Sequence, residues 1–157
     1  MNAVTATKPL KFTRPLVSVW AVLSVTDLKG EDEVLEAVED GRLLFAFNIA
    51  SRNAKARDVR VLSDSVCAFV EGRRLANVSE EQDWQRVLRL IFPSPAPTIQ
   101  AKEIALALNA SSSHIIKLIE ERLLRLAKGT PWFCGRGGSP RVEYQSAVDF
   151  LKARRIF

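Results

Sequence analysis

The chain has 157 residues, of which 47% are hydrophobic and 26% are charged, and its formal net charge is +5. This composition excludes an intrinsically disordered chain, and the length allows one domain or two small ones. No apolar run approaches the ~20 residues that span a bilayer, and residues 1–15 lack the apolar core of a signal peptide. We therefore expect a cytoplasmic protein without membrane contact.

Patterns typical of catalysis and metal binding are missing from the sequence. Its two cysteines, Cys67 and Cys134, stand apart, and no CxxC or Cys/His cluster occurs. We expect neither a disulfide framework nor a metal site. The single histidine, His114, has no partner at a spacing that would build a nucleophile and a base. The sequence therefore predicts no enzyme activity and no cofactor.

An N-terminal arm, residues 1–15, precedes module 1, residues 16–78, whose second predicted helix, GEDEVLEAVEDG, is strongly acidic. Its apolar face includes Val34 and Val38, and Trp20, near the start of the preceding helix, is expected in the core. Six acidic residues occupy its other positions: Glu31, Asp32, Glu33, Glu36, Glu39 and Asp40. DNA phosphates would repel this helix, so we expect it either to be solvated or to bind a protein partner.

Module 1 continues with a predicted hairpin whose strands are Phe45–Ala50 and Val59–Leu62. The loop between them is basic and holds Arg52, Lys55 and Arg57. Neutralising phosphates releases counterions and supplies most sequence-independent affinity for DNA. The loop is therefore a candidate contact to the DNA backbone or to a minor groove.

A connector, residues 79–97, follows module 1. Residues 79–82, SEEQ, have the form of a capping box, and the next apolar positions have helical spacing. These positions are Trp84, Val87, Leu88 and Ile91. We expect this helix to cover the core of module 1 rather than to form a dimer contact. A proline-rich run, residues 93–97, ends the helix and favours a stiff extended path.

Module 2, residues 98–157, opens with two predicted helices joined by a tight turn. Ile104 and Leu108 lie on the apolar face of the first helix, and Ser111 is a candidate N-cap of the second helix, residues 111–123. The polar residues near the start of that helix are where a helix in a major groove meets base edges. We predict DNA contacts from Ser112, Ser113, His114 and Lys117. An exposed position without a DNA contact is the alternative for His114.

Three short runs after this helix favour strands: Leu124–Ala127, Trp132–Cys134 and Arg141–Tyr144. The Gly-rich loop before the last run carries Arg136, which a wing would place against a narrow minor groove or the DNA backbone. The alternative is that the glycines only form a turn and that Arg136 makes no DNA contact. Arg141 is expected to hold a phosphate or an acidic neighbour such as Glu120. A last helix is predicted over Ser146–Arg154.

The net charge of the chain belongs to module 2. Residues 98–157 hold ten Lys or Arg and five Asp or Glu, whereas residues 1–97 hold thirteen of each. A basic module suits a phosphate backbone. The alternative is that the charged side chains of module 2 only face solvent and bind no DNA.

An internal repeat relates the two modules. A shift of 81 residues aligns the following pairs without a gap: Leu43 with Leu124, Arg60 with Arg141, Ser65 with Ser146 and Phe69 with Phe150. Upstream, Val25 and Leu28 fit Ala105 and Leu108 if one residue is deleted from the turn. We therefore expect one fold to occur twice in tandem.

The segments KEIALALNASSSHIIKLIEERLL and SAVDFL, with the strand at Arg141-Val142 between them, resemble the winged helix-turn-helix domains of the MerR and excisionase superfamily. Module 1 keeps the Gly-Arg that usually follows the second helix of such domains, at Gly41-Arg42, whereas module 2 has Arg122-Leu123 there. The resemblance implies a tandem winged helix-turn-helix, mainly α with small β-hairpin wings, of the α+β class.

The same resemblance implies a sequence-specific protein that binds double-stranded DNA, of bacterial, phage or mobile-element type. Such a protein would act as a transcriptional regulator or as an excisionase-like architectural factor. The acidic helix of module 1 favours an alternative, a protein-protein adaptor with little specific DNA binding. Its partner would be a recombinase, a polymerase or a second copy of the chain. The sequence leaves the oligomeric state open.

Overall fold

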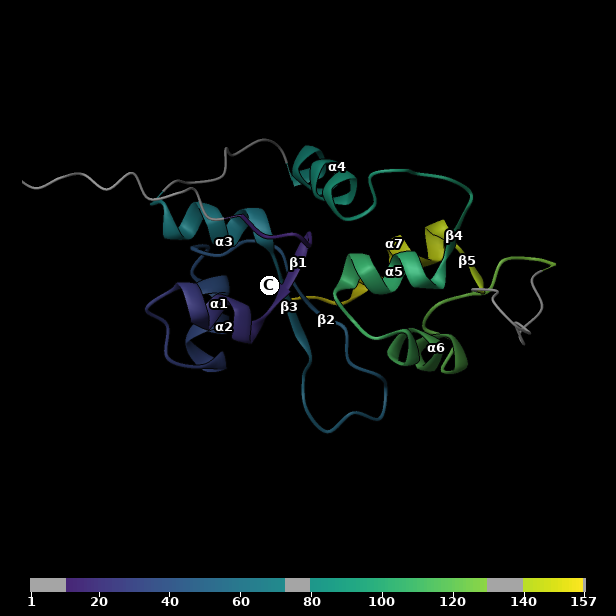
Figure 1. Ribbon diagram of the computed structural model, residues 1–157, viewed down its shortest axis with the longest axis horizontal. Helices are drawn as coiled ribbons and strands as arrows, with labels where there is room; N and C mark the ends of the chain where they lie inside the picture. The colour runs from purple at the N-terminus through teal and green to yellow at the C-terminus, as the bar shows by residue number, and fades with distance from the viewer. Residues whose placement is uncertain (1–10, 73–79, 130–139, 157) are drawn as a thin grey trace, which may run out of the picture.

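A computed structural model describes residues 11–72, 80–129 and 140–156 of the chain (Figure 1). Within these residues the fold is α+β, with seven helices and small antiparallel sheets. Module 1 contains β1 (Leu16–Ser18), α1 (Val19–Val25), α2 (Glu31–Glu39), β2 (Ala46–Asn48), β3 (Val59–Leu62) and α3 (Ser63–Val70).

The connector contributes one helix, α4 (Glu80–Ile91), close to the expected start and end. Module 2 contains β4 (Thr98–Gln100), α5 (Ala101–Leu108), α6 (Ser112–Glu120), β5 (Arg141–Glu143), α7 (Tyr144–Ala153) and β6 (Arg155–Ile156). The second helix of module 2 is therefore shorter at its C-terminal end than the range expected from the sequence.

Apart from β2 in module 1 and β6 in module 2, the described elements follow the same order in both modules: a strand, two helices, a strand and a third helix. In module 1, β1 pairs antiparallel with β3 and places Ser18 opposite Arg60. In module 2, β4 pairs antiparallel with β5 and places Gln100 opposite Arg141. Arg60 and Arg141 thus occupy equivalent positions, as the 81-residue offset predicts.

Two buried serines make the same hydrogen bond in the two modules. The hydroxyl of Ser65 accepts from the backbone N–H of Leu44 at 2.6 Å. The hydroxyl of Ser146 accepts from the backbone N–H of Arg125 at 2.8 Å. A buried polar group is costly without a partner, so this bond gives a physical reason for serine at both positions.

The upstream alignment of Val25 and Leu28 with the first helix of module 2 is wrong. Helix α1 ends at Val25, and Leu28 lies in the turn of residues 26–30 that precedes α2. The turn between α5 and α6, residues 109–111, is shorter because Asn109 adopts the left-handed conformation and reverses the chain at once. Between the starts of its first two helices, module 1 has one residue more than module 2, and this residue lies in the turn of module 1.

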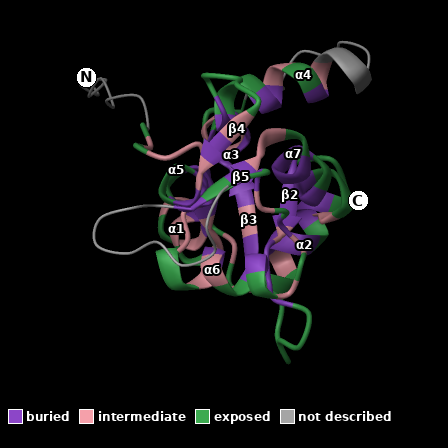
Figure 2. Ribbon diagram, turned by 90° about the vertical axis from the view of Figure 1, so that its right-hand side faces the viewer, coloured by how far each residue is buried: buried purple, intermediate pink, exposed green. Residues whose placement is uncertain are grey.

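One four-stranded sheet lies between two hydrophobic cores. Its order is β1-β3-β2-β6, so the last strand of module 2 completes the sheet of module 1 (Figure 1). Successive side chains of a strand point to opposite faces. Val17 and Val61 face a core with α1 and α2. Leu16, Phe47 and Leu62 face a core shared with α4 and module 2. Strand β3 is accordingly buried over most of its length (Figure 2).

The tryptophans at positions 20 and 84 have opposite environments. Trp84 on α4 is 6% exposed, as expected, and its ring centroid lies 6.2 Å from that of Phe47. Trp20 was expected in the core, but it is 81% exposed. Val22 is the buried residue of α1, and a residue two positions away lies on nearly the opposite side of a helix. Trp20 therefore faces solvent.

The wing of module 2 lies largely outside the described residues. Leu126 forms a single antiparallel bridge with Val142. The strand expected at Trp132–Cys134 and the candidate Arg136 both fall within residues 130–139, which the structure does not describe. Among the described helices, none combines the length and the apolar character that crossing a membrane requires.

Candidate nucleic-acid interface

The turn between α5 and α6 fixes the direction of α6. Asn109 ends α5 with φ at 53°, a conformation that asparagine tolerates better than most residues. The Ser111 hydroxyl accepts from the backbone N–H of His114 at 3.1 Å and so caps α6. Ile115 and Leu118 on the inner face of α6 are fully buried. The opposite face of α6 is thereby turned outward.

Helix α6 presents three of its four predicted DNA-contact residues to solvent. Ser112, Ser113 and Lys117 are exposed, and Ile116 between them is half-buried. Glu120, one turn beyond Ile116 and two turns beyond Ser113, is also exposed. The hydroxyls can bond either base edges or phosphates, and the lysine can neutralise a phosphate.

His114 is placed differently from the other three. Its ring Nε2 lies 2.5 Å from the carbonyl oxygen of Ile49 in module 1, and the residue is half-buried. A hydrogen bond to this carbonyl turns the imidazole toward module 1 rather than outward. The DNA contact expected of His114 stays a prediction, and in this structure the ring joins the two modules.

Arg60 of module 1 donates hydrogen bonds to the same turn, the one between α5 and α6. Its Nε lies 3.1 Å from the carbonyl oxygens of both Leu108 and Asn109, and its Nη2 donates to Asn109 at 3.0 Å. The carboxylate of Asp58 pairs with the guanidinium, and the Arg60 side chain is 13% exposed. The last carbonyls of a helix have no partner within the helix, so Arg60 supplies one from the other module.

Arg141 is the counterpart of Arg60 but has another environment. It is exposed, and its Nη1 donates to the Thr98 hydroxyl at 3.1 Å. Among the described residues, no ion pair joins it to Glu120, the acidic neighbour that the sequence suggested. Its expected phosphate contact stays a prediction.

The β2–β3 loop, residues 49–58, lies beside α6 (Figure 1). The backbone N–H of Arg52 donates to the Glu121 carboxylate at 2.7 Å. The Arg52, Lys55 and Arg57 residues are all exposed. Predicted DNA-contact residues from the two modules, which are distant in sequence, therefore lie on neighbouring elements.

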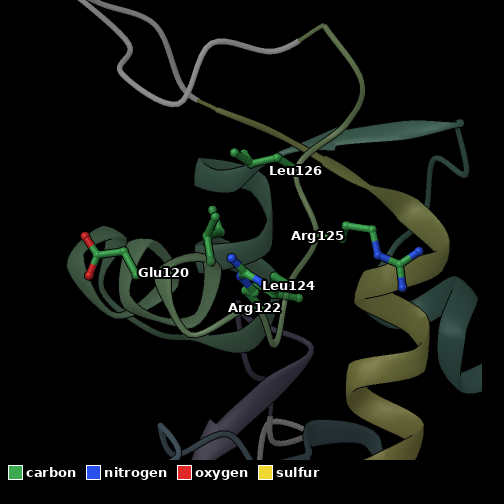
Figure 3. Close-up of a pocket in the computed structure, with 6 residues that line it drawn as sticks. Glu120, Arg122, Leu124, Arg125 and Leu126 are labelled. Atoms are coloured by element: carbon green, nitrogen blue, oxygen red, sulfur yellow. The ribbon is translucent and has the colours of Figure 1, made fainter.

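A hollow of about 580 Å³ opens on another flank of α6 (Figure 3). Its lining residues are Ile119, Glu120, Arg122, Leu124, Arg125 and Leu126. The two arginines of this hollow were not among the candidate site residues. For the first of them the sequence holds a signal, because Arg122 stands where module 1 has Gly41.

Helix α2 exposes the acidic surface expected from its sequence. Asp32, Glu36 and Glu39 are exposed, whereas Val34 and Val38 are buried. No side-chain cap closes the N-terminus of this helix, because its N-cap residue is Gly30. The helix is therefore folded against its core with four of its five carboxylate residues exposed.

Among the described residues, no three His, Cys, Asp or Glu side chains come together as a metal site. No protein-family model, no curated protein and no solved structure matches the chain. The proposed function therefore rests on the sequence of this chain and on its own geometry and charges.

Proposed function

We propose that the chain is a sequence-specific DNA-binding protein built as a tandem of winged helix-turn-helix units. It acts in the cytoplasm on double-stranded DNA, without catalysis or a cofactor. Its role is that of a transcriptional regulator or of an excisionase-like architectural factor, the two roles that resemblance to the MerR and excisionase superfamily implies.

The proposed contact is insertion of α6 into a major groove. An α-helix with its side chains is about 10–12 Å wide, and the major groove is about 12 Å wide. Ser112, Ser113 and Lys117 form the exposed surface near the start of α6 that would meet bases or phosphates. Phosphates would then border the helix on both flanks.

One observation carries the proposal: the basic β2–β3 loop of module 1 is joined to α6 of module 2. The two links are the Arg52 N–H to Glu121 bond and the His114 to Ile49 contact. They hold the loop, which carries three exposed cations, beside the helix that carries Lys117. Clustered Lys and Arg at one face are the electrostatic footprint of nucleic-acid binding.

A second candidate function is a protein-protein adaptor, favoured by two features of module 1. The exposed carboxylates of α2 offer a surface for a basic partner. Trp20, on the adjoining α1, is 81% exposed, and exposed tryptophan is enriched at protein interfaces. A winged helix fold would serve this role as well as DNA binding.

Selection of duplex DNA by the full chain, with affinity measured at two salt concentrations, separates the two candidates. DNA binding predicts a recovered sequence motif and an affinity that falls steeply with salt. No enrichment, together with weak binding to any duplex, contradicts the proposal and favours the adaptor.

A further inference from the structure

Helices α2 and α6 end in the same turn but carry different residues there. Gly41 follows α2 with φ at 76°, and Arg122 follows α6 with φ at 59°. The N–H of Gly41 donates to the Val38 carbonyl at 3.1 Å, and that of Arg122 donates to the Ile119 carbonyl at 3.0 Å. Both helices are thus closed by one left-handed residue.

Arginine is an unfavourable residue for this conformation. Glycine adopts positive φ freely, whereas an L side chain brings its Cβ close to a carbonyl oxygen. Nothing lies within 4 Å of the place where a Cβ would stand on Gly41, so conformation, not space, favours glycine there. Arg122 has the strained conformation although its side chain is exposed and gains no burial. An observed strain of this kind motivates a functional explanation.

The surroundings of Arg122 are open and hold a second arginine, Arg125, together with the carboxylate of Glu120. Arg122 and Arg125 both line the hollow beside α6, and Arg125 extends toward α7 (Figure 3). Arg125 pairs with Glu143 at 3.3 Å, and its side chain is 74% exposed. Among the described residues, the Arg122 guanidinium has no ion-pair partner.

The hollow and the β2–β3 loop contact different parts of α6. Ile119 and Glu120 line the hollow. His114 and the adjoining Glu121 contact module 1 instead. At 3.6 residues per turn, these two pairs project from different flanks of the helix. Cationic side chains therefore border α6 on both flanks.

We propose that Arg122 is a phosphate-binding residue, which contacts the DNA strand on the flank of α6 opposite the β2–β3 loop. This inference rests on the proposed function, because it requires α6 to enter a major groove. A helix that fills the groove has a phosphate strand on each side. The loop supplies cations to one strand, and Arg122 with Arg125 supplies them to the other. The strained arginine thus replaces glycine where an added positive charge meets a phosphate.

Substitutions at position 122 of the full chain separate charge from strain. Arg122→Gly removes both, so it raises the thermal unfolding midpoint by about 2–4 °C and lowers affinity for a duplex of mixed sequence. The slope of log affinity against log salt concentration becomes shallower by about 1. Arg122→Ala keeps the strain and loses the charge, so its affinity falls equally without a gain in the midpoint. Arg122→Lys keeps the charge and the salt slope.

Two further variants make the result interpretable. Gly41→Ala introduces strain at the equivalent turn of module 1 and should lower the midpoint while leaving DNA affinity unchanged. Lys117→Ala reports on α6 itself. If both uncharged variants at position 122 bind with the wild-type salt slope while Lys117→Ala weakens binding, the role of Arg122 is overturned and the proposed function stands. If Lys117→Ala also binds as wild type, the proposed function fails. A lower midpoint for Arg122→Gly would show a structural role and overturn the inference.

Discussion

Helices α2 and α6 occupy equivalent places in the two modules but expose different side chains. Their inner positions stay apolar, as Val34 and Ile115 show. Two of their corresponding exposed positions differ, because Asp32 and Glu36 of α2 stand where α6 has Ser113 and Lys117, whereas the third pair, Glu39 and Glu120, is the same residue. The buried positions are thus apolar in both copies, while two of the three matched exposed positions differ. Fold alone therefore does not give the two helices the same function.

The equivalent arginines of the two modules also differ in their hydrogen-bond partners. Arg60 of module 1 reaches across to the turn of module 2, whereas its counterpart Arg141 bonds within module 2. Module 1 therefore supports α6 through its strand β3 and its β2–β3 loop. In this account, its contribution to DNA binding comes from that support and from the basic loop, not from α2.

The largest expected effect compares the two tryptophans. Trp84→Ala should lower the free energy of unfolding by about 3–5 kcal/mol, because it opens a cavity in the core that both modules share. Trp20→Ala should change it by no more than about 0.5 kcal/mol, because Trp20 is exposed. Chemical denaturation of both variants measures these changes. Similar losses for the two variants would contradict the assigned environments.

The next effect compares Arg60 with Arg141. Arg60→Ala should cost about 2–3 kcal/mol of unfolding free energy, since it leaves the carbonyls of Leu108 and Asn109 without their charged donor. Arg141→Ala should cost about 0.5 kcal/mol or less, because its side chain is exposed. Denaturation of the matched pair tests the link between the modules, and equal costs would argue against it.

The smallest effect compares the two helix N-caps. Ser111→Ala should lower the free energy of unfolding by about 1 kcal/mol, because it removes the acceptor for the His114 N–H. Gly30→Ser should raise it by a few tenths of a kcal/mol, because α2 has no side-chain cap and Gly30 is already extended. Thermal unfolding of the two variants measures both signs. A stabilised Ser111→Ala variant would show that the cap has been misassigned.

Much of the secondary structure could be predicted because it depends on local patterns. The apolar spacing and proline-rich end of the connector placed α4, and the repeat placed β3 and β5 at equivalent positions. Trp20 was misplaced because a seven-residue helix has too few positions for its buried face to be inferred. The assignment as a tandem winged helix-turn-helix and the DNA contacts stay predictions.

The contacts between modules could not be predicted, because they join residues that periodicity does not relate. Strand β6 at the end of module 2 pairs with β2 of module 1, which is distant in sequence, and Arg155 lies opposite Phe47. The His114 ring meets a backbone carbonyl, that of Ile49, which leaves no mark in the sequence. Arg60 and Arg141 look alike in the repeat, and only the packing of the modules distinguishes them.

Exchanging charge between equivalent positions of α2 and α6 tests the central claim most directly. Lys117→Glu and Glu36→Lys reverse the charge at matched exposed sites, and duplex affinity of the full chain is measured for each at two salt concentrations. The account predicts that Lys117→Glu weakens binding more than tenfold, by repulsion from phosphate, while Glu36→Lys changes it by less than about twofold, because α2 lies away from the DNA. Unchanged binding by Lys117→Glu, or a gain from Glu36→Lys as large as that loss, would contradict the account.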